Sequence, residues 1–333
     1  MGMRDFITKR AVSCIITIFA VIMINFFLFR VMPANPVDIM VSPLMGQERL
    51  SEEVREQLIH SLGLDRPLWM QFIIYLRDVA TGNFGYSFMT PRPVLKIIAE
   101  RLPNTIVLMF AGNLIAILIA VALGVVAAWK RGSNIDVSSL IVALTFSSMP
   151  MFWVGGIIII IFSVQLNLFP MFGTGTIGIN YPNVLAYIAD YLHHLFLPMI
   201  TMGLVSFGGL FLIMRGALLD VFTEDYILTA NAIGLPNRTI IFKNALKNAM
   251  LPLITIVGIR LGFMVGGSLL TETVFSWPGI GLTIFRAVNQ RDYPVLQGAF
   301  LIITILVVLA NFVADIIYGS VDPRVRVGVA TRG

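Results

Sequence analysis

The sequence predicts an all-α polytopic membrane protein with six transmembrane helices, and three observations lead to this fold class. Of the 333 residues, 57% are hydrophobic. Only 12% are charged, whereas a soluble domain carries about 25%. Apolar runs of about 20 residues recur along the chain, which is the length that a helix needs to cross the hydrocarbon core of a bilayer.

Six apolar runs are the predicted spans, and they cover about 10–31, 104–129, 137–164, 195–219, 251–272 and 295–318. Trp129 directly precedes Lys130 and Arg131, an order of aromatic and basic residues that is typical of a membrane interface. Pro150 interrupts the third run. The first run is too long for the apolar core of a cleavable signal peptide, so we expect it to remain as a helix.

The distribution of lysine and arginine predicts the orientation. Twelve of these residues lie near the two termini and in the segments 130–136 and 215–250: Arg4, Lys9, Arg10, Lys130, Arg131, Arg215, Arg238, Lys243, Lys247, Arg324, Arg326 and Arg332. The segment 166–194 has none, and the 32–102 segment is too long for the rule to apply. Basic residues mark the cytoplasmic side of short loops, so both termini are predicted to be cytoplasmic. The membrane topology thus explains the excess of basic over acidic residues, and no nucleic-acid partner is expected.

These features divide the chain into four parts. Residues 1–31 hold the N-terminus and the first span, 32–102 form an extracytoplasmic helical subdomain, 103–320 form the transmembrane core with a cytoplasmic loop at 220–250, and 321–333 form a cytoplasmic tail. In the subdomain, Ser51 is a predicted N-cap, Gly63 a helix stop and Pro67 the start of the next helix. That helix has an apolar face made of Leu68, Phe72, Tyr75 and Leu76.

The sequence contains no pattern that predicts catalysis, a metal site or a cofactor. It has no Gly-Lys dipeptide, so a Walker A loop for ATP is excluded. His193 and His194 are adjacent, and on a helix they point about 100° apart, which does not make a two-ligand face. His60 stands alone, and the single Cys14 excludes an internal disulfide framework.

Charged residues inside the predicted spans are the first functional candidates. Each costs roughly 2.5–3.5 kcal/mol at the centre of a spanning helix. Arg260 lies near the middle of the fifth run, and Glu272 closes that run on the outer side. Both are predicted to line a translocation path, and Arg260 should face water or a partner chain rather than lipid. Gly258, Gly262 and Gly266 predict close helix packing in the same run.

The stretch "DYILTANAIGLPNRTIIFKNALKNAMLP", residues 225–252, predicts a helix-turn-helix in the cytoplasmic loop. Thr223 is the predicted cap of the first helix, with Glu224 and Asp225 in its first turn. Gly234 is a predicted left-handed stop, and Asn237 can cap the second helix.

One face of the first helix is predicted to contain Tyr226, Ala230 and Ile233. A short amphipathic helix of this kind can lie in the groove of another protein. The alternative is a helix lying flat on the lipid surface, which the sharp Gly-Leu-Pro turn disfavours.

Several motifs resemble the permease subunits of ABC importers, in the dipeptide, oligopeptide and nickel branch. They are Thr229-Ala230-Asn231-Ala232 with Gly234 and Leu251-Pro252, and the stretches "LGLDRPLWMQF", "TETVFSWPGIGL", "RDYPVLQG" and "DPRVR". The loop lacks the leading acidic residue of the Glu-Ala-Ala signature, and its Gly-to-Pro spacing is longer, as in this branch. Asn83 in "GNFGYS" stands where the family usually has Asp.

This resemblance implies a heterocomplex in the cytoplasmic membrane. A second permease, two ATPase subunits that bind ATP and Mg²⁺, an extracytoplasmic substrate-binding protein and membrane lipid are the implied partners. The chain itself is then a transport subunit and no enzyme. The residues implied to contact the ATPases are Glu224, Asp225, Tyr226, Ala230, Ala232, Gly234 and Leu235.

The implied cargo is di- and oligopeptides, and oligosaccharides, nickel or glutathione are the alternatives within the same architecture. A stand-alone secondary transporter or channel is a different class of function. It would be expected to carry a coupling carboxylate in the middle of the membrane, and it would give the long cytoplasmic loop no role. A membrane-embedded enzyme lacks any supporting nucleophile or metal pattern.

Overall fold

The structure is a computed structural model, and it describes residues 3–31, 52–61, 65–263 and 268–321. Within these residues the chain forms helices and turns, with one isolated antiparallel bridge between Tyr86 and Pro93. The chain divides into two compact units, and each is described by itself. The terminal unit comprises residues 1–103 and 283–333, and the central unit comprises residues 104–282.

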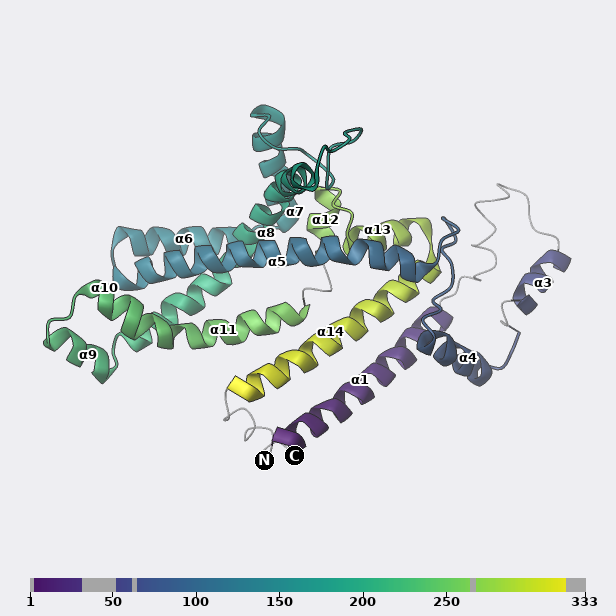
Figure 1. The fold of residues 1–333 in the computed structure, drawn as a ribbon, viewed down its shortest axis with the longest axis horizontal. Helices are drawn as coiled ribbons and strands as arrows, with labels where there is room; N and C mark the ends of the chain where they lie inside the picture. The colour runs from purple at the N-terminus through teal and green to yellow at the C-terminus, as the bar shows by residue number, and fades with distance from the viewer. Residues whose placement is uncertain (1–2, 32–51, 62–64, 264–267, 322–333) are drawn as a thin grey trace. The chain divides into compact units, whose positions relative to one another are not determined.

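In the terminal unit, α1 (Met3–Val31) and α14 (Tyr293–Val321) run side by side (Figure 1). An ion pair of 3.1 Å between Arg10 and Asp315 joins the start of α1 to the final turns of α14. Further along, the Asn25 amide donates to the backbone carbonyl of Gln297 at 3.4 Å. These contacts hold the first and last predicted spans together as an antiparallel pair.

Helix α4 (Leu68–Ala80) packs on α1, and it starts directly after Pro67 as predicted. The ring of Phe72 lies 5.2 Å from that of Phe26, and the Tyr75 hydroxyl donates to Asn25 Oδ1 at 2.7 Å. Burial raises the pKa of Tyr75 to about 12, so this hydroxyl remains a neutral donor. Phe72 and Tyr75 of the predicted apolar face therefore contact the first span, whereas Leu68 is 56% exposed.

Two other elements complete the terminal unit. Helix α3 (Glu52–Ser61) is described, whereas the predicted cap Ser51 and the predicted stop Gly63 lie outside the described residues. The turn that precedes α5 is held to the start of α14 by Asp292, whose carboxylate accepts from the Ser87 hydroxyl and, at 3.0 Å, from the Phe88 backbone N–H.

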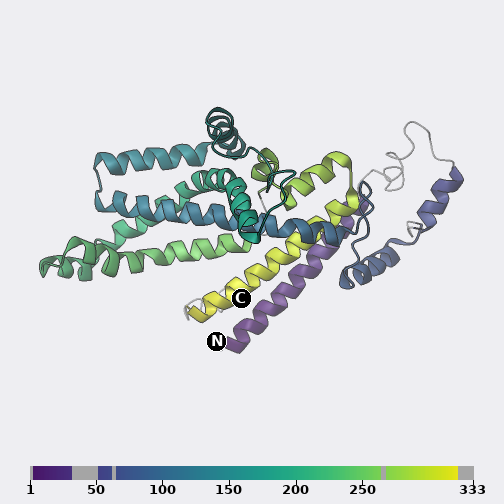
Figure 2. The same cartoon turned by 45° about the horizontal axis from the view of Figure 1, so that its top comes forward.

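The central unit is built around α8 (Val184–Val221), on which four other helices pack (Figure 2). These helices are α5 (Val94–Trp129), α6 (Asn134–Ser148), α7 (Met151–Ile158) and α11 (Leu246–Phe263). Phe207, Leu210, Phe211, Met214 and Leu218 of α8 are fully buried. A Cβ atom at Gly208 would collide with the Ser147 hydroxyl and the Ala143 carbonyl, so glycine is required for the close contact between α6 and α8. Both α5 and α8 begin earlier than the spans predicted from hydropathy.

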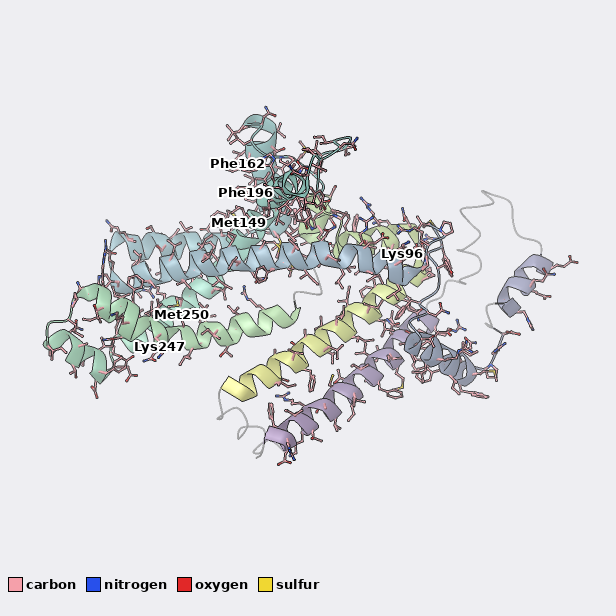
Figure 3. The ribbon with its side chains drawn as sticks, in the orientation of Figure 1. Lys96, Met149, Phe162, Phe196, Lys247 and Met250 are labelled. Carbon is pink, nitrogen blue, oxygen red and sulfur yellow. The ribbon has the colours of Figure 1, made fainter. Side chains whose placement is uncertain are left out.

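The third predicted span, 137–164, is not one straight helix. Helix α6 ends at Ser148, α7 begins at Met151 and continues as the π-helix η1 (Ile159–Gln165), and the two halves meet at 105°. Pro150 has no N–H to donate to the preceding turn, and it forces Met149 into an extended conformation, with ψ at 137°. Met149 lies at this bend (Figure 3).

The fifth predicted span and the second predicted loop helix form one continuous helix. Helix α10 (Asn237–Thr239), the π-helix η2 (Ile240–Ala245) and α11 follow one another without a break, and Pro252 lies inside α11. Two shorter helices, α12 (Leu269–Val274) and α13 (Ile280–Gln290), lie between α11 and α14. Gly266, the last of the three predicted packing glycines, lies outside the described residues. Among the described residues, five helices qualify as membrane spans, and a sixth qualifies if the bent α6–α7 pair counts as one.

Candidate functional site

The 220–250 segment leaves α8 through a tight turn and forms a short helix, α9 (Asp225–Ala232). The Thr223 hydroxyl donates to the carbonyl of Asp220 at 2.7 Å, so it closes α8. The N-cap position of α9 is occupied by Glu224. The prediction that Thr223 caps this helix is therefore wrong by one position. Glu224 and Asp225 are exposed, and their charges favour a helix N-terminus.

The inward face of α9 differs from the predicted one. Ile227 and Ala230 are 1% and 5% exposed, and they belong to a buried cluster with Ile240 and Ala245 of the following helix. The small side chain of Ala230 allows this close packing. The prediction that Tyr226, Ala230 and Ile233 share an outward face is wrong, because Ala230 points into the chain's own core.

The outward side of α9 is apolar as well. Tyr226, Leu228 and Ile233 are 41%, 56% and 68% exposed. Together with Glu224 and Asp225 they form a surface that we name the coupling surface, after the role proposed for it below. Exposed apolar side chains gathered beside two carboxylates are typical of a protein-binding surface. Ala232 is exposed at the end of the same helix, and Leu235 is half-buried against the internal cluster.

Gly234 ends α9 in the left-handed conformation that the sequence predicts, with φ at +75°. The N–H of Leu235 donates to the Ala230 carbonyl at 3.2 Å, which closes the last turn. A Cβ atom at Gly234 would meet nothing within 4 Å. Glycine is therefore favoured here by the backbone angle and not by lack of space.

After this turn, Pro236 takes the N-cap position of α10, so Asn237 is the first helical residue and not the predicted cap. Helix α9 is fastened to α11 by Asn248, whose amide donates to the Tyr226 hydroxyl at 2.7 Å. Lys247 and Met250, labelled in Figure 3, mark the part of α11 that leaves this segment. The coupling surface is thus attached directly to the helix that continues as the fifth span.

A second loop lies at the same end of the central unit, where α5 passes into α6 (Figure 1). Asp136 at the start of α6 accepts two hydrogen bonds from Arg215 of α8, at 2.6 and 2.8 Å, and one from the Gly132 N–H at 2.9 Å. Both side chains are mostly buried. Sequence reasoning missed this pair, although a single acidic residue within the basic 130–136 loop is the signal that could have suggested it.

Glu272 does not close the fifth span as predicted, because it lies on the separate helix α12. Its side chain is 0% exposed. Its carboxylate accepts from the Thr105 hydroxyl at 2.8 Å and from the Leu282 N–H at 3.0 Å, while Thr105 in turn accepts from the Ile280 N–H at 2.8 Å. This arrangement attaches the segment 268–282 to α5.

Arg260 lies in the last described turn of α11, and not near the middle of a separate fifth helix. Its guanidinium is half-buried and lies against α8, where Nη1 is 3.4 Å from the Ser206 carbonyl. A Cβ atom at Gly209 would lie 3.8 Å from Nη2. Among the described residues, no group of three metal-binding side chains could hold a metal ion.

Comparison with known families gives two matches that together span most of the chain. The family described as binding-protein-dependent transport system inner membrane component matches residues 120–327. The family described as the N-terminal part of the membrane component of such systems matches residues 3–109.

Similar curated proteins cover almost the full length of the chain. The di/tripeptide transport system permease protein DppB of Pseudomonas aeruginosa (strain UCBPP-PA14) is 38% identical, over 97% of this chain and 99% of the relative. The dipeptide transport system permease protein DppB of Escherichia coli (strain K12) is 35% identical over the same shares. The oligopeptide transport system permease protein AppB of Bacillus subtilis (strain 168) is 35% identical, over 97% of this chain and 100% of the relative.

A solved structure supports the fold. A chain from inward facing conformations of the MetNI methionine ABC transporter has a TM-score of 0.55 and is 19% identical, covering 70% of this chain and 100% of that chain. At this level of identity the likeness concerns the fold alone.

Proposed function

The chain belongs to the family of binding-protein-dependent transport system inner membrane components, and we propose that it is the permease subunit of an ATP-driven importer of di- and oligopeptides. The observation that carries this proposal is the identity of 35–38% to relatives named as di/tripeptide, dipeptide and oligopeptide permeases, over 97% of the chain. The helical fold with its long apolar helices agrees with a permease subunit.

The proposed assembly contains a second permease, two ATPase subunits and an extracytoplasmic binding protein in the cytoplasmic membrane. The ATPases would bind ATP and Mg²⁺ and hydrolyse the ATP. This chain would contribute part of the translocation path for the peptide. Residues 32–102 are proposed to lie outside the membrane, on the side of the binding protein.

Both termini are proposed to be cytoplasmic. The basic residues favour this orientation. Two structural observations support it separately. The start of α1 and the end of α14 lie at one end of the terminal unit, where Arg10 pairs with Asp315. In the central unit, Trp129 contacts Phe222 with ring centroids 5.7 Å apart, so the basic loop after α5 and the 220–250 segment share one end.

Coupling to the ATPases is proposed to occur through the coupling surface. The exposed Tyr226, Leu228 and Ile233 supply apolar area, and Glu224 and Asp225 supply charge at the helix N-terminus. Ala230, Gly234 and Leu235 act indirectly, because they set how α9 is held against the rest of the chain. Motion of an ATPase would then pass through α9 to α11.

Two substitutions to glutamate test this division of roles. Ile233→Glu changes an exposed side chain, so the permease should fold normally, with the free energy of unfolding changed by less than about 0.5 kcal/mol. It should nevertheless lose ATPase subunits on purification. Ala230→Glu buries an unpaired charge in the internal cluster, so it should lower the thermal stability of the permease itself.

The measurement is peptide uptake into proteoliposomes that contain all subunits, with ATPase retention and thermal unfolding recorded for each variant. Thr8→Glu is the matched control, because it adds the same charge at an exposed position of α1. Full ATPase retention and uptake in Ile233→Glu would contradict the coupling role. Uptake of nickel or an oligosaccharide in place of peptides by the unmodified complex would overturn the proposed cargo.

A further inference from the structure

We infer that the guanidinium of Arg260 binds the terminal carboxylate of a peptide as the peptide crosses the membrane. This inference rests on the proposed function and deepens it, since it names the chemical group of the cargo that this chain recognises. Four features of Arg260 carry the inference: its depth, its lack of a counter-charge, the open face beside it and the chemistry of its side chain.

Arg260 lies far along its helix from the basic segment at the start of that helix. The helix is continuous from Asn237 through Lys247 to Arg260. At about 1.5 Å per residue, the guanidinium-bearing residue lies about 20 Å along the axis from Lys247, the last lysine of the basic cytoplasmic segment. A hydrocarbon core about 30 Å thick that begins near Lys247 would therefore extend past Arg260.

No carboxylate pairs with Arg260 in the part of the chain that the structure describes. Three other charged side chains of these helices do have partners: Arg215 pairs with Asp136, Arg10 pairs with Asp315, and Glu272 accepts hydrogen bonds from neutral donors. The one hydrogen bond of Arg260 to a described residue runs to the Ser206 carbonyl at 3.4 Å, which is long for a hydrogen bond. A guanidinium has five N–H donors, so most of its capacity is available to a ligand.

The surface of α8 beside this guanidinium is open. Gly209 is exposed and has no side chain, and a Cβ atom added there would approach Arg260 Nη2 to 3.8 Å. Leu212, one turn further along α8, is 41% exposed. The described chain therefore leaves a face on which a small ligand can reach the guanidinium.

A carboxylate of the cargo fits this cation better than a fixed carboxylate of a partner chain. A fully paired buried ion pair adds little stability over an apolar pair of the same shape. A permanent partner would thus gain little from an arginine at this depth. A peptide with a free C-terminus instead brings a charge that needs compensation each time it leaves water. The planar guanidinium can supply two parallel hydrogen bonds to that carboxylate.

The test compares a dipeptide with its C-terminal amide, both first shown to bind the binding protein, in proteoliposomes of the complete complex. Uptake of each peptide is divided by the ATP hydrolysis that the loaded binding protein stimulates. Arg260→Met removes the charge at similar length, and Arg260→Lys keeps it. Arg4→Gln is the control, because it removes an exposed positive charge from the start of α1.

We expect Arg260→Met to lower uptake of the free-acid peptide per ATP by about ten- to a hundredfold, because a hydrogen-bonded charge is lost. Uptake of the amide per ATP should be unchanged, Arg260→Lys should restore part of the free-acid uptake, and Arg4→Gln should behave as the unmodified protein.

Equal losses of uptake of the acid and the amide in Arg260→Met would overturn the inference. Loss of the second permease from the purified Arg260→Met complex would also overturn it, because Arg260 would then pair with a carboxylate of that partner. Unchanged uptake in Arg260→Met would overturn it as well. If the unmodified complex hydrolyses ATP but takes up neither peptide, the proposed cargo fails instead, and the inference fails with it.

Discussion

At Gly234 the backbone angle alone decides which residues the chain tolerates. Its φ is +75°, and the space around a Cβ atom is empty. An L-residue with a Cβ pays a conformational penalty there of about 1–2 kcal/mol, and a β-branched residue is a marked outlier in this region. A substitution at this position therefore introduces conformational strain without a steric clash.

We predict that Gly234→Val leaves membrane insertion and ATP hydrolysis intact but lowers uptake per ATP, because α9 would leave its position on the following helix. Gly234→Asn is the matched control, since asparagine adopts the left-handed conformation several-fold more readily than other residues with a Cβ. The measurement is uptake and hydrolysis in the same proteoliposomes. Normal coupling in the valine variant would show that the angle at this turn does not matter for transport.

Sequence reasoning placed Gly234 correctly but misjudged Ala230. A glycine followed by Leu-Pro predicts a left-handed turn from local chemistry, and no distant contact is needed to see it. Ala230 faces inward together with Ile227, one turn before it, and both belong to the buried cluster that contains Ile240. The side chain of alanine is small and only weakly hydrophobic. The helical pattern therefore could not predict whether Ala230 lies on the buried or the exposed side of α9.

At the scale of elements, the Asp136–Arg215 pair joins the start of α6 to α8 through two hydrogen bonds. We predict that Asp136→Asn lowers the free energy of unfolding by about 1–3 kcal/mol, because a hydrogen-bonded charge is lost from a mostly buried pair. Thermal unfolding of the purified permease in detergent is the measurement. A double-mutant cycle with Arg215→Gln would give the coupling between the two residues.

The matched control is Arg77→Gln, which breaks a largely exposed ion pair with Asp78. Exposed pairs contribute little, so its thermal midpoint should stay close to that of the unmodified protein. Equal shifts for Asp136→Asn and Arg77→Gln would mean that the α6–α8 pair is not a significant anchor.

Hydropathy predicted the existence of the long helices, but not how they are broken or joined. Pro150 marked the interruption of the third run, but it predicted neither the bend of 105° nor the packing of α7 against α8. Pro252 also lies in an apolar run, and there the helix continues through it. The position of Glu272 on a separate helix could not be predicted from the sequence. Its partners, Thr105 and the Leu282 N–H, are distant in sequence or lie beyond a turn.

At the scale of the whole molecule, the proposed orientation can be tested with single cysteines in a Cys14→Ser background. Ile177 is 99% exposed in the loop between η1 and α8, and Asn237 is exposed at the start of α10. We predict that a membrane-impermeant thiol reagent added outside cells labels Ile177→Cys and not Asn237→Cys. After permeabilisation both should react, which controls for reactivity. The reverse pattern in intact cells would invert the topology.

The unbroken helix from Asn237 to Phe263 has a mechanical consequence. It extends for about 40 Å, and Ala249 and Leu253, which are 0% and 1% exposed, lie close to its midpoint. When a helix pivots about a point near its middle, its two ends move in opposite directions. Any movement of α9 that tilts this helix about its middle would therefore displace Arg260 in the opposite direction.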